Sequence, residues 1–196
     1  ILDAQGSLLL SMRHRKGGNV EEYDFVKDGD QSFLNWDFVA KVVENQSDPY
    51  GDKYSGVAQT DWGNAFYIAG PVFDVDGRQI GTILVGKSLS SIVSAARTET
   101  LAQVTLYDLS GEILSSTLNQ PKPVDRDTIA SIIANQDVSS LSRAQRDLLV
   151  ANIDYQEIIG PWEIRDDTDI GIMGSALPKS FYVSPDRVTR IQVILL

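Results

Sequence analysis

Cysteine is absent from this 196-residue sequence, and histidine occurs once, as His14. The absence of cysteine excludes a disulfide framework, a thiolate nucleophile and a cysteine-bound metal. A catalytic triad that uses histidine would have to assemble around His14, and nothing in the neighbouring basic run of residues 13–16 suggests one. The sequence therefore gives no support to an enzyme of this type.

Positive charge is also scarce, because 17 lysines and arginines face 27 aspartates and glutamates, for a formal net charge of −10 at pH 7. A binding face for nucleic acid or for an anionic membrane surface would have to overcome this repulsive field, so we expect neither as a partner. The basic run at residues 13–16 is too short to reverse that field. We expect it to be the solvated end of a hairpin.

No apolar run is long enough to span a bilayer. The chain begins at Ile1 and ends in the apolar residues 190–196, which suggests a piece of a longer protein. Four residues, 193–196, do not decide between the start of a membrane helix, which we favour, and the end of a soluble one. With 42% hydrophobic and 22% charged residues, the chain is ordinary for one large or two small folded domains.

Residues 66–89 form the clearest pattern in the sequence. Two apolar runs rich in β-branched and aromatic residues flank Asp74-Val75-Asp76-Gly77, which predicts two antiparallel strands joined by a tight turn. Gly81 and Gly86 in or beside the second run permit a bulge or a close backbone approach.

Further elements are predicted on both sides of this hairpin. We expect a strand, a turn and a strand over residues 1–12, a polar loop over 16–31, a helix over 36–45 capped by Asn35, and an amphipathic helix over 88–101. A helix is also expected over 127–134, and Ser184-Pro185 predicts the start of a closing helix over 185–196.

The second half of the chain repeats the order of the first. Residues 106–114 align with residues 1–9 with their turn Asp and Gly in register, Gly160-Pro161 matches Gly70-Pro71, and Ile170-Gly171 matches Ile80-Gly81. We therefore predict two copies of one unit, over residues 1–97 and 98–196.

This duplicated order resembles the double Cache family of extracytoplasmic sensor domains. The resemblance covers nearly the whole chain and rests on residues 50–52, 67–72, 74–77, 80–86 and 88–89. It implies an α+β fold of two tandem PAS-like modules, each an antiparallel sheet with flanking helices. In such a fold the first module is membrane-distal and binds a small ligand, and the second is membrane-proximal and passes the signal on.

The resemblance also implies a place in a larger receptor. The full protein would be a membrane-anchored histidine kinase, chemoreceptor or cyclase, active in two-component signalling or chemotaxis. A long helix normally precedes the first strand of the family and packs along both units, whereas this sequence starts at that strand.

Family members that bind amino acids carry an Arg-x-Trp, a Tyr-x-Asp and a final Asp. Here Trp36 is retained but Leu34 replaces the Arg, Tyr50 and Asp52 match the Tyr-x-Asp, and Lys87 replaces the final Asp. Lys87 favours an anionic ligand, since a shielded charge-assisted hydrogen bond to a carboxylate contributes about 1.5–3 kcal/mol. The alternative is that Lys87 forms an ion pair with Asp52 or Asp61.

The candidate ligand contacts combine this resemblance with the aromatic residues of the first unit, which could line a concave pocket. They are Trp36, Tyr50, Asp52, Tyr54, Asp61, Trp62, Tyr67 and Lys87. Aromatic residues at strand and helix spacing often pack in a core instead, so those in the loop-rich part are the better candidates.

No metal site, cofactor or catalytic residue is predicted. Asp74-x-Asp76-Gly77 begins like a calcium loop but lacks the later acids, so a hairpin turn is the better interpretation. The acids at 166, 167 and 169 fit a solvated turn better than a weak cation site. Three hypotheses remain: a ligand-binding sensor module, a module that only dimerises or docks through protein contact, and, least supported, an enzyme.

Overall fold

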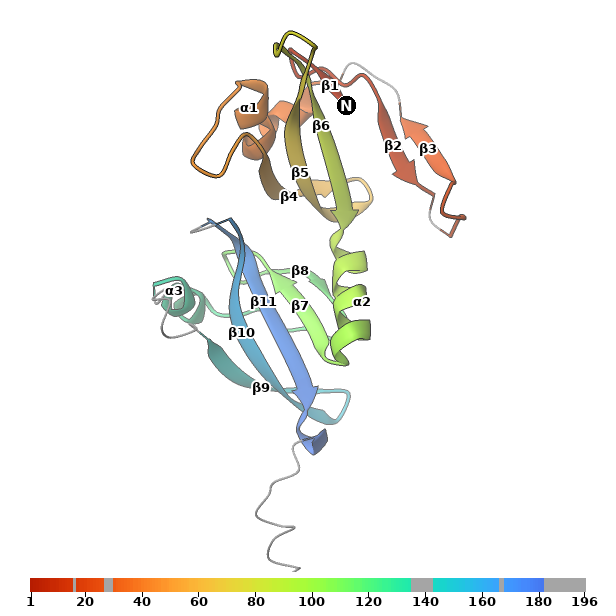
Figure 1. The fold of residues 1–196 in the computed structure, drawn as a ribbon. Helices are drawn as coiled ribbons and strands as arrows, with labels where there is room; N and C mark the ends of the chain where they lie inside the picture. The colour runs from red at the N-terminus through yellow and green to blue at the C-terminus, as the bar shows by residue number, and fades with distance from the viewer. Residues whose placement is uncertain (16, 27–29, 135–142, 166–167, 182–196) are drawn as a thin grey trace, which may run out of the picture. The chain divides into compact units, whose positions relative to one another are not determined.

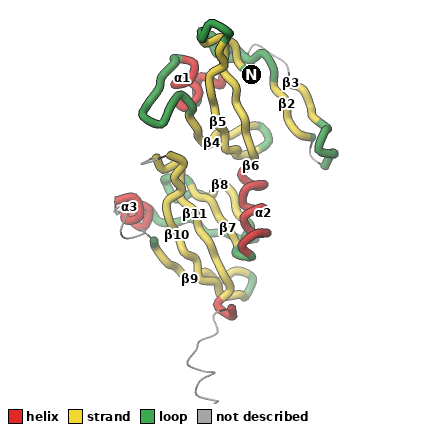
Figure 2. Tube along the Cα trace, viewed as in Figure 1, coloured by secondary structure: helices red, strands yellow, loops and turns green. Residues whose placement is uncertain are grey.

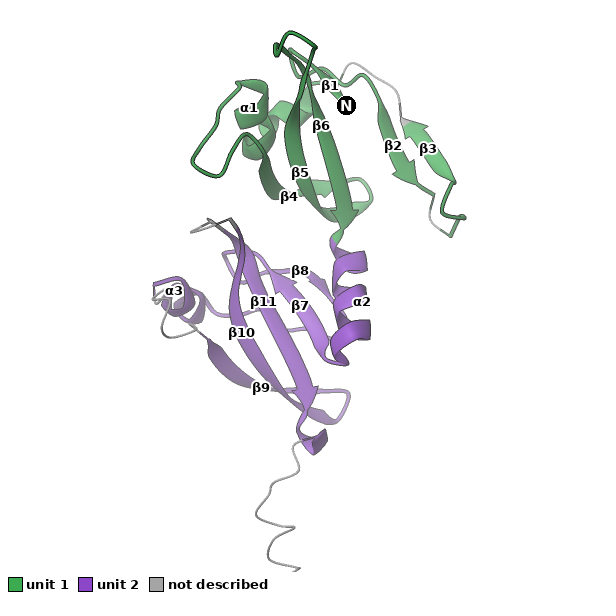
Figure 3. Ribbon diagram, viewed as in Figure 1, with its two compact units in different colours: residues 1–88 green, residues 89–196 purple. Residues whose placement is uncertain are grey.

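The computed structural model describes residues 1–15, 17–26, 30–134, 143–165 and 168–181. The chain divides into two compact units, Ile1–Ser88 (unit 1) and Leu89–Leu196 (unit 2), shown in Figure 3. The division falls at the start of helix α2, whereas the sequence interpretation placed it between residues 97 and 98. The predicted closing helix over 185–196 and the acids at 166 and 167 lie outside the described residues.

Unit 1 is a four-stranded antiparallel sheet in the order β1-β6-β5-β4 (Figure 1). Its strands are β1 (Leu2–Asp3), β4 (Tyr54–Thr60), β5 (Gly63–Phe73) and β6 (Gln79–Ser88). A 3-10 helix, η1 (Ser32–Asn35), leads into α1 (Asp37–Val43). Helix α1 buries Phe38, Val39 and Val42 in the core of this unit.

The predicted central hairpin is confirmed as β5 and β6. In the turn between them Asp74 Oδ1 accepts hydrogen bonds from the N–H groups of Asp76 and Arg78, and Asp74 pairs with the Arg78 guanidinium. These donors make Asp74 part of a hairpin turn, as expected. Gly81 is confirmed as a close approach, because a Cβ there would lie 2.5 Å from the Leu2 carbonyl oxygen.

Two local predictions in unit 1 are wrong. The N-cap of α1 is Trp36, not Asn35, because the chain first makes the 3-10 turn η1. The expected polar loop over 16–31 contains β3 (Tyr23–Val26), which pairs with β2 (Ser11–His14) in a separate two-stranded sheet. The basic run does lie at the end of this hairpin, and Arg15 pairs there with Asp24 at 2.9 Å.

Unit 2 is a five-stranded antiparallel sheet in the order β8-β7-β11-β10-β9 (Figure 2). Its strands are β7 (Gln103–Tyr107), β8 (Ile113–Ser116), β9 (Ala144–Val150), β10 (Ile153–Arg165) and β11 (Thr168–Pro178). The helices are α2 (Leu89–Thr100), α3 (Arg126–Ala134) and the 3-10 turn η2 (Lys179–Phe181). The predicted helices over 88–101 and 127–134 are confirmed as α2 and α3. Among the described helices, none is long and apolar enough to cross a membrane.

The internal repeat is visible in the turns and in the register. Asp3 and Asp108 each accept hydrogen bonds from the N–H groups two and four residues later, and each turn ends in a glycine with positive φ, Gly6 or Gly111. Gly171 approaches the Tyr107 carbonyl oxygen as Gly81 approaches that of Leu2. Unit 2 thus repeats the strand order of unit 1 around the same turn, with β8 as an additional edge strand, and the predicted α+β architecture of antiparallel sheets with flanking helices is confirmed.

Candidate functional site

On the α1 side of the unit 1 sheet, aromatic rings pack over glycine residues of the strands. Tyr67 in the central strand β5 lies opposite Gly56 of β4 and Gly86 of β6. A Cβ at residue 86 would collide with the Tyr67 ring, and one at residue 56 would collide with Phe38 of α1. The two glycines therefore make room for two aromatic rings.

These rings belong to an aromatic cluster at the junction of η1, α1 and the sheet. The Trp36 ring centroid lies 5.2 Å from that of Tyr67, 5.8 Å from Phe38 and 5.1 Å from Phe33. Trp36 and Tyr67 are only partly buried, and burial raises the pKa of the Tyr67 hydroxyl. Two predicted contacts, 31 positions apart in the chain, thus come together.

Tyr54 of β4 lies on the same side of the sheet and packs against the same core. The Lys41 ammonium lies 5.7 Å from the Tyr54 ring centroid, within the range of a cation–π interaction, and 2.6 Å from Asp37 Oδ2. Three predicted residues, Trp36, Tyr54 and Tyr67, therefore share the α1 side. We call these three residues the aromatic site.

The other five predicted residues lie elsewhere in unit 1. Tyr50 is exposed in the loop before β4, and Asp52 in the same loop pairs with Lys53 at 2.9 Å, which lowers the pKa of its carboxyl group. Asp61 and Trp62 lie in the β4–β5 turn, where the Arg13 guanidinium stands 5.3 Å from the Trp62 ring.

Lys87 lies on the opposite face of the sheet from the aromatic site. Lys87 lies opposite Phe66 of β5, and the next pair along the two strands is Gly86 opposite Tyr67. Successive side chains in a strand point to opposite faces of the sheet, so Lys87 and Tyr67 lie on different faces. Among the described residues no ion pair joins Lys87 to Asp52 or Asp61. Leu34, at the position of the family's Arg, packs over Gly6.

The face that carries Lys87 is apolar and open to solvent. The residues that alternate with the aromatic site along the strands are Val57, Phe66, Ile68, Ile83 and Val85. Ile68 is 47% exposed and Val85 is 65% exposed. A sheet with one solvated face normally carries polar side chains there, so this outer face has the character of a contact surface.

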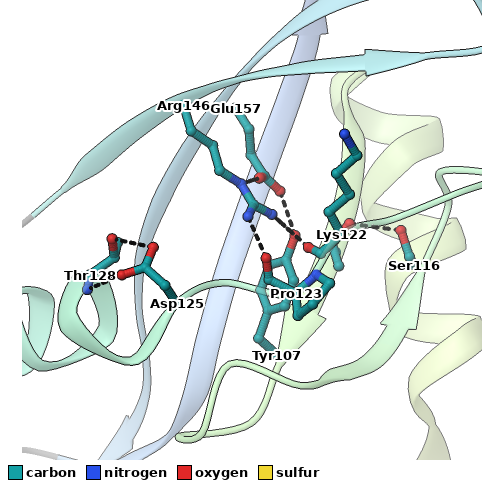
Figure 4. A network of polar contacts seen from close by, with 9 residues as sticks. Tyr107, Ser116, Lys122, Pro123, Asp125, Thr128, Arg146 and Glu157 are labelled. Carbon is teal, nitrogen blue, oxygen red and sulfur yellow. Dashed lines mark hydrogen bonds and ion pairs between the residues drawn. The ribbon is translucent and has the colours of Figure 1, made fainter.

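Unit 2 contains a buried polar network that the sequence interpretation missed (Figure 4). Glu157 of β10 is fully buried and pairs with Arg146 of β9, with Nε 2.6 Å from Oε2. The Tyr107 hydroxyl donates to Glu157 Oε1 at 2.8 Å and accepts from Arg146 Nη2 at 2.9 Å. Burial, and then the neighbouring Glu157 charge, raise the pKa of Tyr107.

Arg146 also reaches the chain between β8 and α3. Its Nη1 donates to the Pro123 carbonyl at 2.6 Å and its Nη2 to the Lys122 carbonyl at 2.7 Å. The cross-strand register that sets Arg146 opposite Glu157 could have been read from the turn at Ala151 and Asn152. In the described part of the chain no cluster of three or more acids or histidines could hold a metal ion.

No family model matches the sequence, and no curated protein matches it. Among solved structures, a methyl-accepting chemotaxis protein X shares the fold at a TM-score of 0.54 and 17% identity, over 85% of this chain and 62% of that one. The periplasmic sensory domain of the Campylobacter jejuni chemoreceptor Tlp1 matches at a TM-score of 0.49 and 13% identity, over 83% of this chain and 61% of that one.

An extracellular ligand-binding receptor from Desulfohalobium retbaense also matches at a TM-score of 0.49 and 13% identity, over 89% of this chain and 28% of that one. The chain therefore spans less than two thirds of the length of these structures. The similarity to the chemotaxis protein confirms the fold that the double Cache resemblance implied.

Proposed function

We propose that this chain is the extracytoplasmic small-molecule-sensing domain of a membrane-bound signalling receptor and that it catalyses no reaction. The observation that supports the proposal most is the fold shared with a methyl-accepting chemotaxis protein over 85% of the chain. The duplicated unit and the excess of acidic residues agree with it. In this proposal unit 1 is the membrane-distal module that binds the ligand and unit 2 is the membrane-proximal module.

The ligand site that we propose is the aromatic site of unit 1. Its three rings come from η1–α1, β4 and β5, so they are held on rigid elements, and each is only partly buried. Partly exposed aromatic rings with a polar edge are well suited to a small molecule. Leu34 over Gly6 leaves this side without the arginine that holds a ligand carboxylate in the amino-acid-binding relatives.

An anionic ligand at Lys87 remains a separate proposal. Lys87 lies across the sheet from the aromatic site, so one small ligand would not contact both. If Lys87 binds a carboxylate, Lys87→Ala weakens that ligand while Tyr67→Phe leaves it unchanged. If the aromatic site is the ligand site, Tyr67→Phe weakens ligand binding and Lys87→Ala leaves it unchanged.

The experiment is a thermal-shift screen of the chain against carboxylic acids, amino acids, amines, sugars and purines. A ligand at a hundredfold its dissociation constant adds about 2.7 kcal/mol to the free energy of unfolding. We expect a hit whose affinity falls in Tyr67→Phe and Tyr54→Phe, while the control Tyr23→Phe in β3 binds as the parent does. If no compound in the screen stabilises the chain, ligand binding is abandoned in favour of the contact-only module.

The contact-only alternative is favoured by the outer apolar face of unit 1. In the family that the sequence resembles, a long helix packs along both units, and a second copy of the chain could cover the same face in a homodimer. Exposed apolar area favours association, so a homodimer is the expected form in this alternative. Sedimentation of the chain measures whether the dimer forms. Ile68→Ser with Val85→Thr should then shift a dimer to monomer, whereas a parent chain that is already monomeric at high concentration excludes the homodimer.

A further inference from the structure

The two units differ at one repeated position. Tyr67 and Glu157 each lie four residues before the matching prolines, Pro71 and Pro161, in the inner strand next to the edge strand β4 or β9. The residue opposite Tyr67 in the edge strand is Gly56, and the residue opposite Glu157 is Arg146. An aromatic site in unit 1 thus corresponds to a buried ion pair in unit 2.

This ion pair interrupts the core of unit 2. Apolar residues gather in two clusters, one around Ile159 and Ile172 and one around Leu148 and Tyr155. Glu157 and Arg146 lie between them in sequence and register. A buried ion pair is often no more stabilising than two apolar side chains of similar volume, so packing alone does not account for it.

The network has a second end, on the segment that leads into α3. We call residues 118–124 the strap. Leu118 and Val124 at its ends are buried, and Lys122 and Pro123 between them are exposed. Asp125 then caps α3 by accepting hydrogen bonds from the Thr128 N–H and hydroxyl groups, each at 2.8 Å. The two carbonyls that bind Arg146 therefore belong to residues two and three positions before the helix cap (Figure 4).

The hydrogen bonds at the two ends of the network differ in how easily they can be exchanged for hydrogen bonds to water. Glu157 is completely buried, so its bonds to Arg146 and Tyr107 cannot be exchanged for water without opening the sheet. The Arg146 side chain is 24% exposed, and its other partners are main-chain carbonyls of exposed residues. The bonds to the strap are therefore the more easily exchanged for bonds to water, and opening also has to expose Val124 of the strap and Ile129 and Ile132 of α3, which pack in the unit 2 core.

We propose that Arg146 is a latch that holds the strap and α3 against the unit 2 sheet, and that unit 2 exchanges between this closed state and one in which strap and helix have left the sheet together. Glu157 and Tyr107 fix the guanidinium on the sheet in both states. The device gives unit 2 a conformational change of its own.

Hydrogen exchange of the whole chain tests the latch. The variant Arg146→Met with Glu157→Met removes both charges together, so no unpaired charge is left buried. Tyr107→Phe in the same background removes the hydroxyl that otherwise loses both of its partners. We expect amides of the strap and of α3 to exchange about tenfold faster or more, since two charge-assisted hydrogen bonds are lost, while amides of β10 and β11 keep their protection. A purely structural role would change both sets of amides together.

Two further variants make the result decisive. Arg146→Lys keeps a charge beside Glu157 but cannot span both carbonyls, and it should speed exchange in α3 in the same direction. Asp147→Asn removes the neighbouring exposed ion pair with Lys179 and should leave α3 unchanged. The proposal is overturned if strap and α3 exchange at the parent rate in both Arg146 variants, or if they slow or speed in parallel with β10 and β11.

Discussion

The absence of a side chain at residue 86 allows the Tyr67 ring to lie over β6. Adding a methyl group forces the ring to move, and overpacking of this kind costs about 1–3 kcal/mol. Gly86→Ala should lower the free energy of unfolding by this amount in urea titrations, and most of the loss should vanish in a Tyr67→Ala background.

Gly70→Ala is the matched control for this cycle, because it lies in the neighbouring strand and its Cβ would meet only the flexible Lys53 side chain at 3.2 Å. We expect a smaller loss than for Gly86→Ala, because the Lys53 side chain can move aside. An equal cost of Gly86→Ala with and without the Tyr67 ring would show that the ring is not the obstacle.

Tyr107 predicts a pH dependence in unit 2. Burial and Glu157 raise its pKa in the folded state, so the folded chain holds this proton where the unfolded chain, with a pKa near 10.0, has lost it. Its contribution to stability is complete below pH 10 and falls as the pH rises further, by about 1.4 kcal/mol per pH unit. Tyr107→Phe should remove this part of the slope in denaturation curves between pH 9 and 11. Identical slopes for parent and variant would contradict the assignment.

At the level of elements, the repeated turn allows backbone strain to be separated from packing. Gly77 and Gly111 occupy the same place in equivalent turns, with φ of 78° and 89°. A Cβ at residue 77 meets nothing within 4 Å, whereas one at residue 111 collides with the Val124 carbonyl oxygen.

Alanine at either position has to adopt the left-handed conformation, which costs about 1–2 kcal/mol. Gly77→Ala should show that cost alone, and Gly111→Ala should lose about 1–3 kcal/mol more from overpacking. The difference between the losses in the free energy of unfolding of the two variants, measured in urea titrations, gives the cost of the contact between the turn and the strap. Equal losses would mean that this segment moves away freely.

The same turns explain how much of the fold could be predicted from sequence. An Asp followed by a Gly between apolar runs defined the β5–β6 hairpin, and its recurrence at Asp3 and Asp108 revealed the repeat. Strand β3 was missed because Tyr23 and Phe25 are exposed and the strand pairs with β2 in a separate two-stranded sheet, so no alternation with a core marks it. The cap of α1 was misplaced because a 3-10 turn has no apolar period of its own.

The candidate site could be predicted only in part. Aromatic composition suggested Trp36, Tyr54 and Tyr67, and the family resemblance placed Lys87 with them. The one-residue offset of the pleat puts Lys87 on the other face of the sheet. Only the Arg146–Glu157 pair of the network could be read from a hairpin, because Tyr107 and Glu157 lie 50 positions apart on strands that are separated by β11. Partners this distant in sequence require a known strand order.

On the scale of the whole molecule, the proposed ligand site in unit 1 and the proposed latch in unit 2 take part in one response only if they are coupled. Coupling between two sites is reciprocal, so a ligand that changes the opening of the strap has its own affinity changed by the same factor. If the closed state of the latch binds the ligand more tightly than the open state, binding in unit 1 slows exchange in α3 by about fivefold or more.

The latch variant Arg146→Met with Glu157→Met should then bind the ligand of unit 1 more weakly by a comparable factor, although neither residue belongs to unit 1. Calorimetric titration of parent and variant measures this factor, and Asp147→Asn provides the control with an unchanged latch. If the ligand slows α3 while the variant binds as tightly as the parent, the exchange effect does not come from the latch. If neither changes, unit 2 takes no part in the response, and the signal must leave unit 1 by another route.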